Sequence, residues 1–538
     1  MEEEGKDQVT IPNALRALGS VLVAGAAALA TQLVPPSAVK LLAQVAPPLI
    51  FVDVTAQTGL PELVAKWKAE RVAAGDTRWW PTAITAGDFR GTGQLDLVFS
   101  HHGAPGTRIY TLVSKSGATP VFEDHTEART LSGSFGAIGG DGSTYIFDAN
   151  DDGAPDITAI TDEVLPQTAF NDGAGNFTIK RTPFMDGQSQ QAFKFAMARL
   201  SDVNGDDRID VEGLVPFRVM LNRGGGVYEA AKAAPGTTYL DLTPDMIVPG
   251  MPAIDVQRKW YYARHLDIGA GHGQVIIATF GSGTRPQQLF VIRRDPSGAY
   301  VDVTAALGLP AAGRVSGVYD INRDGLPDLL VTASPQSGVY LNQQGRFERV
   351  VDALAADLST TPLDSATTLD SLADFDEDGR PELLTVTFRY GRQSRLYQDV
   401  GGSFARAPVN LVGSWQYVVA DLDGDGRLDI VAGSKVGLTV FLNRTPALGN
   451  FMNVRLRNGA DALVEAYSPA GRLLARVRNN TPGIPALLSV CGIGHSHGGN
   501  LPIHLGLGWA DTIILRVTFP GGRVVTLTNV KTNQTVSM

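Results

Sequence analysis

A nine-residue acidic segment recurs along the chain and restricts the fold more than any other feature of the sequence. The clearest copy is Asp421-Leu-Asp-Gly-Asp-Gly-Arg-Leu-Asp429, which is followed by the apolar run Ile-Val-Ala-Gly. Four similar copies begin at Asp148, Asp202, Asp320 and Asp374, and two copies with fewer acidic residues begin at Asp88 and Asp267. The steps between successive copies are 60, 54, 65, 53, 54 and 47 residues. Seven copies at this spacing predict seven four-stranded blades of a β-propeller.

A second element follows several acidic segments and supports the same period. It appears as Ala169–Phe177, Leu221–Tyr228 and Tyr340–Phe347, with a shorter copy at Phe441–Asn443. In each copy an apolar residue and an Asn come before a Gly-rich or polar stretch. The apolar part fits a buried strand and the Asn/Gly cluster fits a turn, so we expect a hairpin at each place.

The two ends of the repeat region predict how the chain is divided. Phe51-Val-Asp-Val-Thr55 has the pattern of a blade's last strand, Tyr300-Val-Asp-Val-Thr304, but comes before the first acidic segment. We therefore expect this N-terminal strand to complete the last blade and cover its edge. After about Gly449 the acidic segments stop and short alternating strands follow. The predicted fold is all-β, with a seven-bladed propeller over 49–448, a small β domain over 449–538, and one helix near 61–74.

Residues 1–48 differ from the rest of the chain. Ala17–Ala30 is uncharged and rich in Ala, Val and Leu, and it ends in the small-x-small pattern of a signal peptidase site. A signal peptide or an uncleaved N-terminal anchor with its linker fits this segment, although Glu2, Glu3, Glu4 and Asp7 replace the usual positive region. We expect a secreted, periplasmic or cell-surface protein, with membrane association through this segment if it is not cleaved.

The net charge restricts the binding partners, and the cysteine count restricts the disulfides. The 538 residues carry a formal net charge of -10, which disfavours nucleic acid and favours small cations. The single cysteine, Cys491, excludes an intrachain disulfide and fits a buried inert thiol.

The acidic segments and the second elements that follow them, which we call Leu-Asn elements, together resemble the FG-GAP or VCBS repeats of integrin-α-like propellers. The C-terminal region, with Gly492-Ile-Gly, His504–Gly508, Phe519-Pro-Gly-Gly and Asn529–Gln534, resembles the ASPIC/UnbV domain of cartilage acidic protein relatives. This resemblance implies an extracytoplasmic, calcium-binding protein of the adhesion type. The chain departs from the family pattern at Phe519, where Trp is common, and in the segments at Asp88 and Asp267, whose metal binding is therefore open.

Calcium binds six to eight oxygen ligands, mostly carboxylates and carbonyls. In this repeat, positions 1, 3, 5 and 9 supply side chains, and position 7 supplies a backbone carbonyl. The predicted ligands of about five structural Ca²⁺ sites are Asp148, Asn150, Asp152, Ala154 and Asp156; Asp202, Asn204, Asp206, Arg208 and Asp210; Asp320, Asn322, Asp324, Leu326 and Asp328; Asp374, Asp376, Asp378, Arg380 and Glu382; and Asp421, Asp423, Asp425, Arg427 and Asp429.

The sequence of these segments fits a sharply turning calcium loop but not an EF-hand. Position 6, where the backbone must turn sharply, is Gly in four of the five copies and Asp207 in the other. Position 12 is never the Glu of an EF-hand, and strands rather than helices flank the segments. The alternative is that the aspartates only cap turns, but several carboxylates within nine residues would repel one another without a cation.

Three strand starts that precede acidic segments are rich in aromatic and basic residues, which suit a peptide anchor or a stacked sugar ring. The candidate ligand-binding residues are Arg78, Trp79, Trp80, Trp260, Tyr261, Tyr262, Arg264, Trp415 and Tyr417. Packing between blades is the alternative for each of them.

No catalytic motif is present, and we expect a non-catalytic protein. His495, His497 and His504 lie close together in the sequence but have no acidic partner at motif spacing, so a zinc site is disfavoured. The expected function is binding of a protein or extracellular-matrix ligand. A lectin-like polysaccharide binder, a polysaccharide-degrading enzyme and a structural subunit of an envelope complex are the alternatives.

Overall fold

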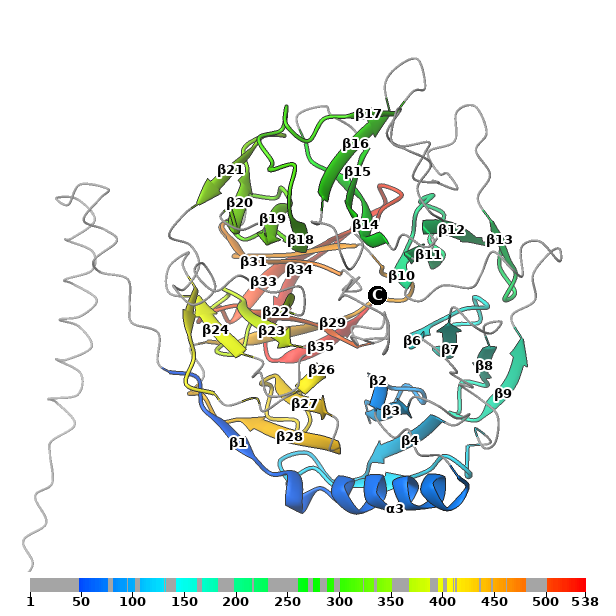
Figure 1. The fold of residues 1–538 in the computed structure, drawn as a ribbon. Coiled ribbons are helices and arrows are strands. Elements are labelled where there is room, and N and C mark those ends of the chain that lie inside the picture. Colours follow the sequence, from blue (N-terminus) through cyan, green and yellow to red (C-terminus); the bar gives the residue numbers. More distant parts are fainter. Residues whose placement is uncertain are drawn as a thin grey trace, which may run out of the picture. The chain divides into compact units, whose positions relative to one another are not determined.

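The structure is a computed structural model of the chain (Figure 1). It describes residues 48–75, 81–93, 95–101, 107–129, 131, 142–161, 167–181, 198–214, 217–230, 260–269, 274–280, 288–294, 300–322, 324–332, 336–350, 367–387, 395–399, 404–409, 411, 414–434, 437–446, 449–460, 462–479 and 501–538. The predicted leader or anchor over residues 1–48 therefore lies outside the described residues, except for Pro48. In the part of the chain that is described, no helix is long and apolar enough to cross a lipid bilayer.

The described residues form seven four-stranded antiparallel sheets that follow one another along the chain. Sheet 1 contains β2 (Pro81–Gly87), β3 (Asp96–His101), β4 (Thr107–Leu112) and β5 (Phe122–Asp124). Sheet 2 contains β6 (Gly142–Phe147), β7 (Asp156–Thr161), β8 (Gln167–Asn171) and β9 (Phe177–Arg181). Sheet 3 contains β10 (Ala198–Ser201), β11 (Asp210–Leu214), β12 (Phe217–Asn222) and β13 (Tyr228–Ala230).

Sheets 4 to 7 repeat this order. Sheet 4 contains β14 (Trp260–Asp267), β15 (Gln274–Phe280), β16 (Gln288–Arg294) and β17 (Tyr300–Asp302). Sheet 5 contains β18 (Arg314–Tyr319), β19 (Asp328–Thr332), β20 (Gly338–Asn342) and β21 (Phe347–Val350). Sheet 6 contains β22 (Thr367–Ala373), β23 (Glu382–Thr387), β24 (Arg395–Asp399) and β25 (Phe404–Arg406), and sheet 7 contains β26 (Ser414–Ala420), β27 (Asp429–Ser434), β28 (Gly437–Asn443) and β1 (Phe51–Asp53).

The first strands of the sheets pack against one another, and the cores lie between neighbouring sheets. Strand β2 packs against β6 and β26, and β18 packs against β14 and β22. Between sheets 1 and 2, for example, Val98 and Ile109 share a buried cluster with Ile157 and Phe177. Each acidic segment joins the first two strands of its sheet, so the repeat places all of these segments at corresponding positions. We call them loops 1 to 7 in chain order, with loop 1 beginning at Asp88 and loop 7 at Asp421.

The N-terminal strand completes the last sheet, as predicted. Strand β1 pairs antiparallel with β28, and Asp53 accepts the backbone N–H of Thr55 at 2.9 Å. The Thr55 hydroxyl in turn accepts the Val440 N–H at 2.9 Å. The same turn closes sheet 4, where Thr304 accepts the N–H of Val291. Sequence similarity between the two segments therefore reflects an identical structural role.

The predicted helix near 61–74 is present as α3 (Leu60–Ala73), one residue earlier than expected. A short 3₁₀ turn, η2 (Thr55–Gln57), precedes it. Gly59 starts the helix in the left-handed region (φ 77°), and Leu60, Val64 and Trp67 are its buried residues. These side chains pack against sheets 7 and 1, and the Trp67 ring meets the Phe99 ring of β3 edge to face at 5.4 Å.

The C-terminal region forms two further sheets. Strand β29 (Phe451–Arg455) pairs with β32 (Ile503–Gly506) and, in parallel, with β35 (Gln534–Ser537). The second sheet has the order β31 (Leu473–Arg478), β30 (Leu463–Tyr467), β33 (Thr512–Thr518) and β34 (Val524–Lys531). The two share one core, which includes Val454, Val464 and Leu515. The described chain is thus mostly β, and the alternating strands predicted after Gly449 are present.

Candidate metal centres

The acidic loops share one backbone arrangement. In loop 7 the carboxylate of Asp421, at position 1, accepts the N–H of Gly426, at position 6, at 3.0 Å. The same bond joins Asp148 to Gly153 in loop 2 and Asp374 to Gly379 in loop 6, both at 2.8 Å. The bond also occurs in loop 3, to Asp207, and in loop 5, to Gly325. The repeated sequence therefore folds into a repeated loop, with its first carboxylate directed inward.

Position 6 has a left-handed backbone in every one of these loops. The φ values are 94° for Gly153, Gly325 and Gly426, and 85° for Gly379. Asp207 adopts φ 63° without the freedom of glycine. Asp tolerates this region better than most residues, which explains how loop 3 keeps the arrangement despite its different sequence.

The acid at position 9 ties each loop to its sheet. In loop 7 Asp429 accepts the N–H of Leu422 at 2.8 Å with one oxygen and the N–H of Asn443 at 2.8 Å with the other. The corresponding acids of loops 2, 3 and 5, which are Asp156, Asp210 and Asp328, accept the same two bonds. All four carboxylates are fully buried. These two hydrogen bonds hold the position-9 carboxylate of each of these loops in place without a bound ion.

Loops 6 and 7 bring three carboxylates together closely enough for one metal ion. Ligand oxygens of Asp374, Asp376 and Glu382 all lie within 4.8 Å of one another. The same is true of Asp421, Asp423 and Asp429. These are positions 1, 3 and 9, three of the four predicted side-chain positions; the position-5 residues, Asp378 and Asp425, are not part of these groups. Hard oxygen ligands in such number suit Ca²⁺ better than a softer transition metal.

Burial makes the charge of these carboxylates costly. Asp374 is 7% exposed, and its Oδ1 has no hydrogen-bond partner among the described residues. Burial, and then the nearby Asp376, raise the pKa of Asp374 well above its ordinary value, and the pKa of Glu382 is raised in the same way. Burial also raises the pKa of Asp429 to about 8 and that of Asp421 to about 6. A bound cation would remove this penalty by favouring the ionised forms.

Loops 2, 3 and 5 have Asn instead of Asp at position 3. In each of them the Asn side-chain amide donates to the Asp at position 5, for example from Asn150 to Asp152 at 2.9 Å. The Asn oxygen accepts the backbone N–H of position 5; in loop 3, for example, the Asp206 N–H donates to the Asn204 oxygen at 3.1 Å. Burial raises the pKa of Asp156 and Asp210 to about 8 and that of Asp328 to about 7. These loops therefore offer oxygen ligands of lower total charge than loops 6 and 7.

Position 5 closes the loop onto position 7. Asp425 accepts the N–H of Arg427 at 3.0 Å, and Asp378 accepts that of Arg380 at 2.7 Å. The carbonyls of Ala154, Arg208, Leu326, Arg380 and Arg427 remain predicted ligands.

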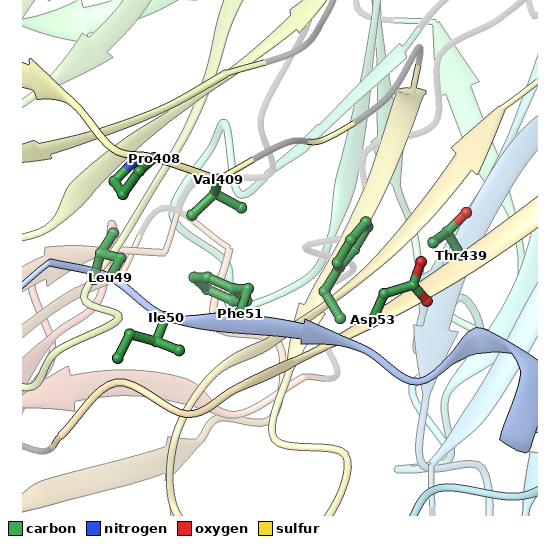
Figure 2. Close-up of a pocket in the computed structure, with 8 residues that line it drawn as sticks. Leu49, Ile50, Phe51, Asp53, Pro408, Val409 and Thr439 are labelled. Atoms are coloured by element: carbon green, nitrogen blue, oxygen red, sulfur yellow. The ribbon is translucent and has the colours of Figure 1, made fainter.

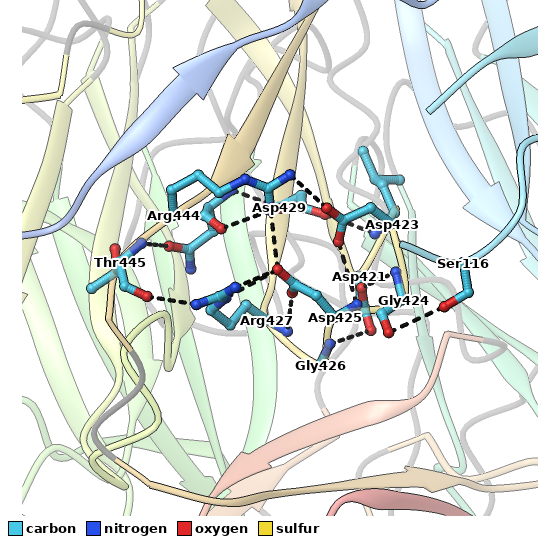
Figure 3. Close-up of polar contacts among 12 residues, drawn as sticks. Ser116, Asp421, Asp423, Gly424, Asp425, Gly426, Arg427, Asp429, Arg444 and Thr445 are labelled. Carbon is cyan, nitrogen blue, oxygen red and sulfur yellow. Dashed lines mark hydrogen bonds and ion pairs between the residues drawn. The ribbon is translucent and has the colours of Figure 1, made fainter. Parts of the chain in front are cut away.

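Arginines partly balance the charge of loop 7 (Figure 3). Arg444 reaches Asp423 at 2.7 Å and Asp425 at 3.0 Å, while Arg427 pairs with Asp425. Asp421 and Asp429 receive backbone N–H groups instead. Among the described residues, no arginine pairs with the two carboxylates at the ends of the loop, so both are available to a cation.

An asparagine in the Leu-Asn elements links neighbouring sheets, a role that the sequence reading missed. The Asn171 side chain donates to the Phe89 carbonyl at 2.8 Å, and Asn342 donates to the Ile268 carbonyl at 3.0 Å. Each acceptor is position 2 of the preceding sheet's loop. The asparagine oxygen also organises the turn, where Gly175 donates to Asn171 at 3.0 Å. The predicted turn role is confirmed. The sequence signal for the link between sheets was the Asn that follows an apolar residue in each of these elements.

The aromatic candidates can be placed only in part. Arg78, Trp79 and Trp80 lie outside the described residues. Trp260, Tyr261, Tyr262 and Arg264 lie in β14 and Trp415 lies in β26, both of which directly precede an acidic loop. Tyr417 is buried in the core cluster of sheets 6 and 7, together with Phe375 and Ile430. Its environment therefore fits the packing alternative.

The histidine cluster is also described only in part, since His495 and His497 lie outside the described residues. His504 in β32 shares a hydrogen bond of 2.9 Å with Asn453 and stacks on Phe451. Burial lowers the pKa of His504 to about 4, which keeps the ring neutral.

A pocket of about 510 Å³ lies beside β1 (Figure 2). Its walls come from the start of β1, from the segment after β25 and from β28, and its lining residues are Leu49, Ile50, Phe51, Asp53, Pro408, Val409, Thr439 and Phe441. None of these residues belongs to an acidic loop, so the pocket is separate from the candidate metal centres.

Comparison with known proteins identifies the repeat. The FG-GAP-like repeat family matches residues 320–385 and 374–432, which contain loops 5, 6 and 7. The chain therefore contains FG-GAP-like repeats. No curated protein sequence matches it significantly.

Solved structures resemble the chain only remotely. An Agrocybe aegerita lectin that recognises non-reducing terminal N-acetylglucosamine is 15% identical, with a TM-score of 0.40 over 78% of this chain and 98% of the lectin. YCF48 bound to D1 peptide is 9% identical, with a TM-score of 0.38 over 74% of this chain and 99% of YCF48. BBS1N in complex with ARL6DN is 12% identical, with a TM-score of 0.34 over 69% of this chain and 94% of BBS1N.

Proposed function

We propose that the chain is a seven-bladed β-propeller stabilised by calcium ions in loops 2, 3, 5, 6 and 7, and that it binds a protein ligand outside the cytoplasm. The seven sheets would be the blades, and β1 would close the ring by completing the last one. The C-terminal sheets would form a domain of the ASPIC/UnbV type.

The observation that carries the calcium assignment is the buried carboxylate group of loop 6. Asp374, Asp376 and Glu382 converge within 4.8 Å, and one Asp374 oxygen has no hydrogen-bond partner among the described residues. Three ionised carboxylates so close together would repel one another strongly at low dielectric. A divalent cation with oxygen preference resolves this repulsion and uses the unpartnered atom.

The metal role is structural rather than catalytic. Each loop joins the first two strands of a sheet, and in loops 2, 3, 5 and 7 the acid at position 9 also accepts the backbone N–H of the Asn in the third strand. An ion bound there connects three strands of one sheet. A structural metal of this kind supports our proposal of a binding protein rather than an enzyme.

Thermal unfolding in calcium and in a chelator tests this proposal. We expect a calcium-dependent rise in the unfolding temperature, since a ligand that binds only the folded state stabilises it. Mg²⁺ at the same concentration is the matched control, and it should have a smaller effect because it prefers rigid octahedral sites. An unfolding temperature that is the same in calcium and chelator would contradict the proposal.

Protein binding is tested by co-purification from the native source in calcium, followed by a binding assay with the purified partner. A glycan array run in parallel tests the lectin alternative. A partner whose binding is lost in chelator supports the proposal, whereas binding of a defined glycan alone contradicts it.

A further inference from the structure

Loop 1 has kept the shape of the acidic loops but not their ligands. It retains Asp88 at position 1 and Asp96 at position 9, while Arg90 and Thr92 occupy positions 3 and 5. Asp88 still accepts the N–H of Gly93, at position 6, at 2.6 Å. Gly93 has the left-handed φ of 82° that the other loops show at this position. The loop therefore holds two inward carboxylates with fewer oxygen ligands for a metal.

The first of two arginines pairs with Asp96. Arg129 lies in the turn after β5 and reaches the Asp96 carboxylate at 2.6 Å, and both side chains are buried, at 7% and 0% exposure. Thr111 donates to the other oxygen of Asp96 at 2.5 Å and accepts from Arg129 at 2.8 Å. In the sequence, Arg129 takes the place of Thr58 and Leu307 in the related turns that follow β1 and β17. The arginine is therefore particular to this loop.

The second arginine comes from the C-terminal region. Arg455, the last residue of β29, reaches Asp88 at 2.8 Å, and the Asp88 side chain is 4% exposed. Other arginines of this region also approach loops: Arg457 lies 3.5 Å from Asp148, and Arg476 lies 3.3 Å from Asp320. In loops 2 and 5, however, the acid at position 9 accepts backbone N–H groups rather than an arginine. Among the described loops, an arginine on both end carboxylates is found only in loop 1.

We infer that loop 1 is a guanidinium site, in which Arg129 and Arg455 take the place that a metal ion has in the proposed calcium loops. Two guanidinium groups carry the same charge as one divalent cation and supply directed donors to both carboxylates. Removing one partner of a buried ion pair leaves the other partner's charge buried and uncompensated, so the loss of either arginine should destabilise the fold. The C-terminal region thereby supplies a ligand to sheet 1. This inference uses the proposed calcium loops for comparison, but the arginine pairs do not depend on them.

A double-mutant cycle on the full chain tests the Arg455 pair. Arg455→Met and Asp88→Asn should each lower the unfolding temperature by a few degrees, and to the same extent in calcium and in chelator. The double variant should lose no more than the larger single loss. Arg223→Met is the control, because its pair with Glu229 is exposed and should contribute little. Arg455→Lys keeps the charge and should recover part of the loss. Unchanged unfolding temperatures, or additive losses, would overturn the inference.

Calcium stoichiometry tests the same site independently. Asp88→Asn should leave the number of bound ions unchanged. The variant Arg90→Asp, Thr92→Asp, Arg129→Met and Arg455→Met should bind one ion more than the parent chain, because it restores positions 3 and 5 and removes both competing guanidinium groups. If the Asp88→Asn variant binds one ion fewer than the parent chain, loop 1 binds metal and the inference is overturned. If the parent chain binds no calcium at all, the proposed function fails, whereas the double-mutant cycle still decides the guanidinium site.

Discussion

Asn443 of the last sheet donates its side-chain amide to the carbonyl of Phe375, the second residue of loop 6, at 2.7 Å. The Asn443 oxygen accepts the Thr445 N–H at 2.9 Å, and its backbone N–H binds Asp429. One buried residue thus connects its own loop through its backbone, and its own turn and the loop of the preceding sheet through its side chain. The same connection is made by Asn171 and Asn342.

Removing only the donor of Asn443 should weaken the connection between sheets 6 and 7. Asn443→Asp keeps the shape and the oxygen, but leaves the buried Phe375 carbonyl without its amide donor, so we expect a loss of about 1–3 kcal/mol. Asn222→Asp is the matched control, because the Asn222 amide nitrogen has no partner among the described residues. Both variants place a charge beside the acid at position 9, so the difference between them isolates the connection. Urea unfolding measures it, and equal losses would contradict this role.

Loop 6 should lose its ion when its first ligand is neutralised. Asp374→Asn keeps the side-chain shape but removes the charge, so we expect one bound Ca²⁺ fewer per chain and a smaller calcium-dependent rise in unfolding temperature. Asp172→Asn is the control, since Asp172 is a turn residue that binds the N–H groups of Ala174 and Asn176. Calcium titration calorimetry counts the ions. An unchanged count for Asp374→Asn would exclude loop 6 as a calcium site.

The chain in chelator should be less stable at pH 8 than at about pH 5.5. Burial raises the folded-state pKa of Asp156, Asp210 and Asp429 to about 8, whereas an unfolded Asp titrates near 3.9. In this range the folded chain holds more protons than the unfolded chain, so its stability decreases as the pH rises through the folded pKa.

Calcium should reverse this trend, because the ion binds the ionised carboxylates. The gain in stability from calcium should therefore increase from about pH 5.5 to pH 8. Urea unfolding at both pH values, with and without calcium, measures the four free energies. A chelated chain that becomes more stable toward pH 8 would contradict the raised pKa values.

Asp207 should tolerate only residues that accept a left-handed backbone. Asp207→Asn should be nearly neutral, since its ion pair with Arg523 is exposed on both sides. Asp207→Val should cost about 1–2 kcal/mol, because a β-branched residue is strained at φ 63°. Urea unfolding of the two variants separates these cases, and equal stability would show that the loop can relax.

The repeat could be predicted from the sequence because each copy obeys the same local chemistry. Alternating acids, a turn at position 6 and an apolar run after position 9 predicted the loops, the following strand and the spacing of the sheets. The match between Phe51–Thr55 and Tyr300–Thr304 likewise predicted that β1 joins the last sheet. Asp207 shows that even a departure from the pattern at position 6 left the loop intact.

The contacts between distant segments could not be predicted in the same way. Arg455 and Asp88 are separated by 367 residues, and nothing in a single sequence pairs them. Asn171 and Phe89 belong to neighbouring sheets, so the role of the Asn appears only once the sheets are packed. Tyr417 shows the converse, because an aromatic residue that was a candidate for ligand binding is part of the core. Tertiary packing, rather than local pattern, decides these roles.

The mass of the intact folded chain in calcium tests the central claim most directly. Native mass spectrometry of calcium-equilibrated protein should give the mass of the chain plus about five Ca²⁺ ions, and chelator should return it to the mass of the bare chain. A bare-chain mass at saturating calcium, with the protein still folded, would show that the acidic loops are not metal sites and would contradict the account.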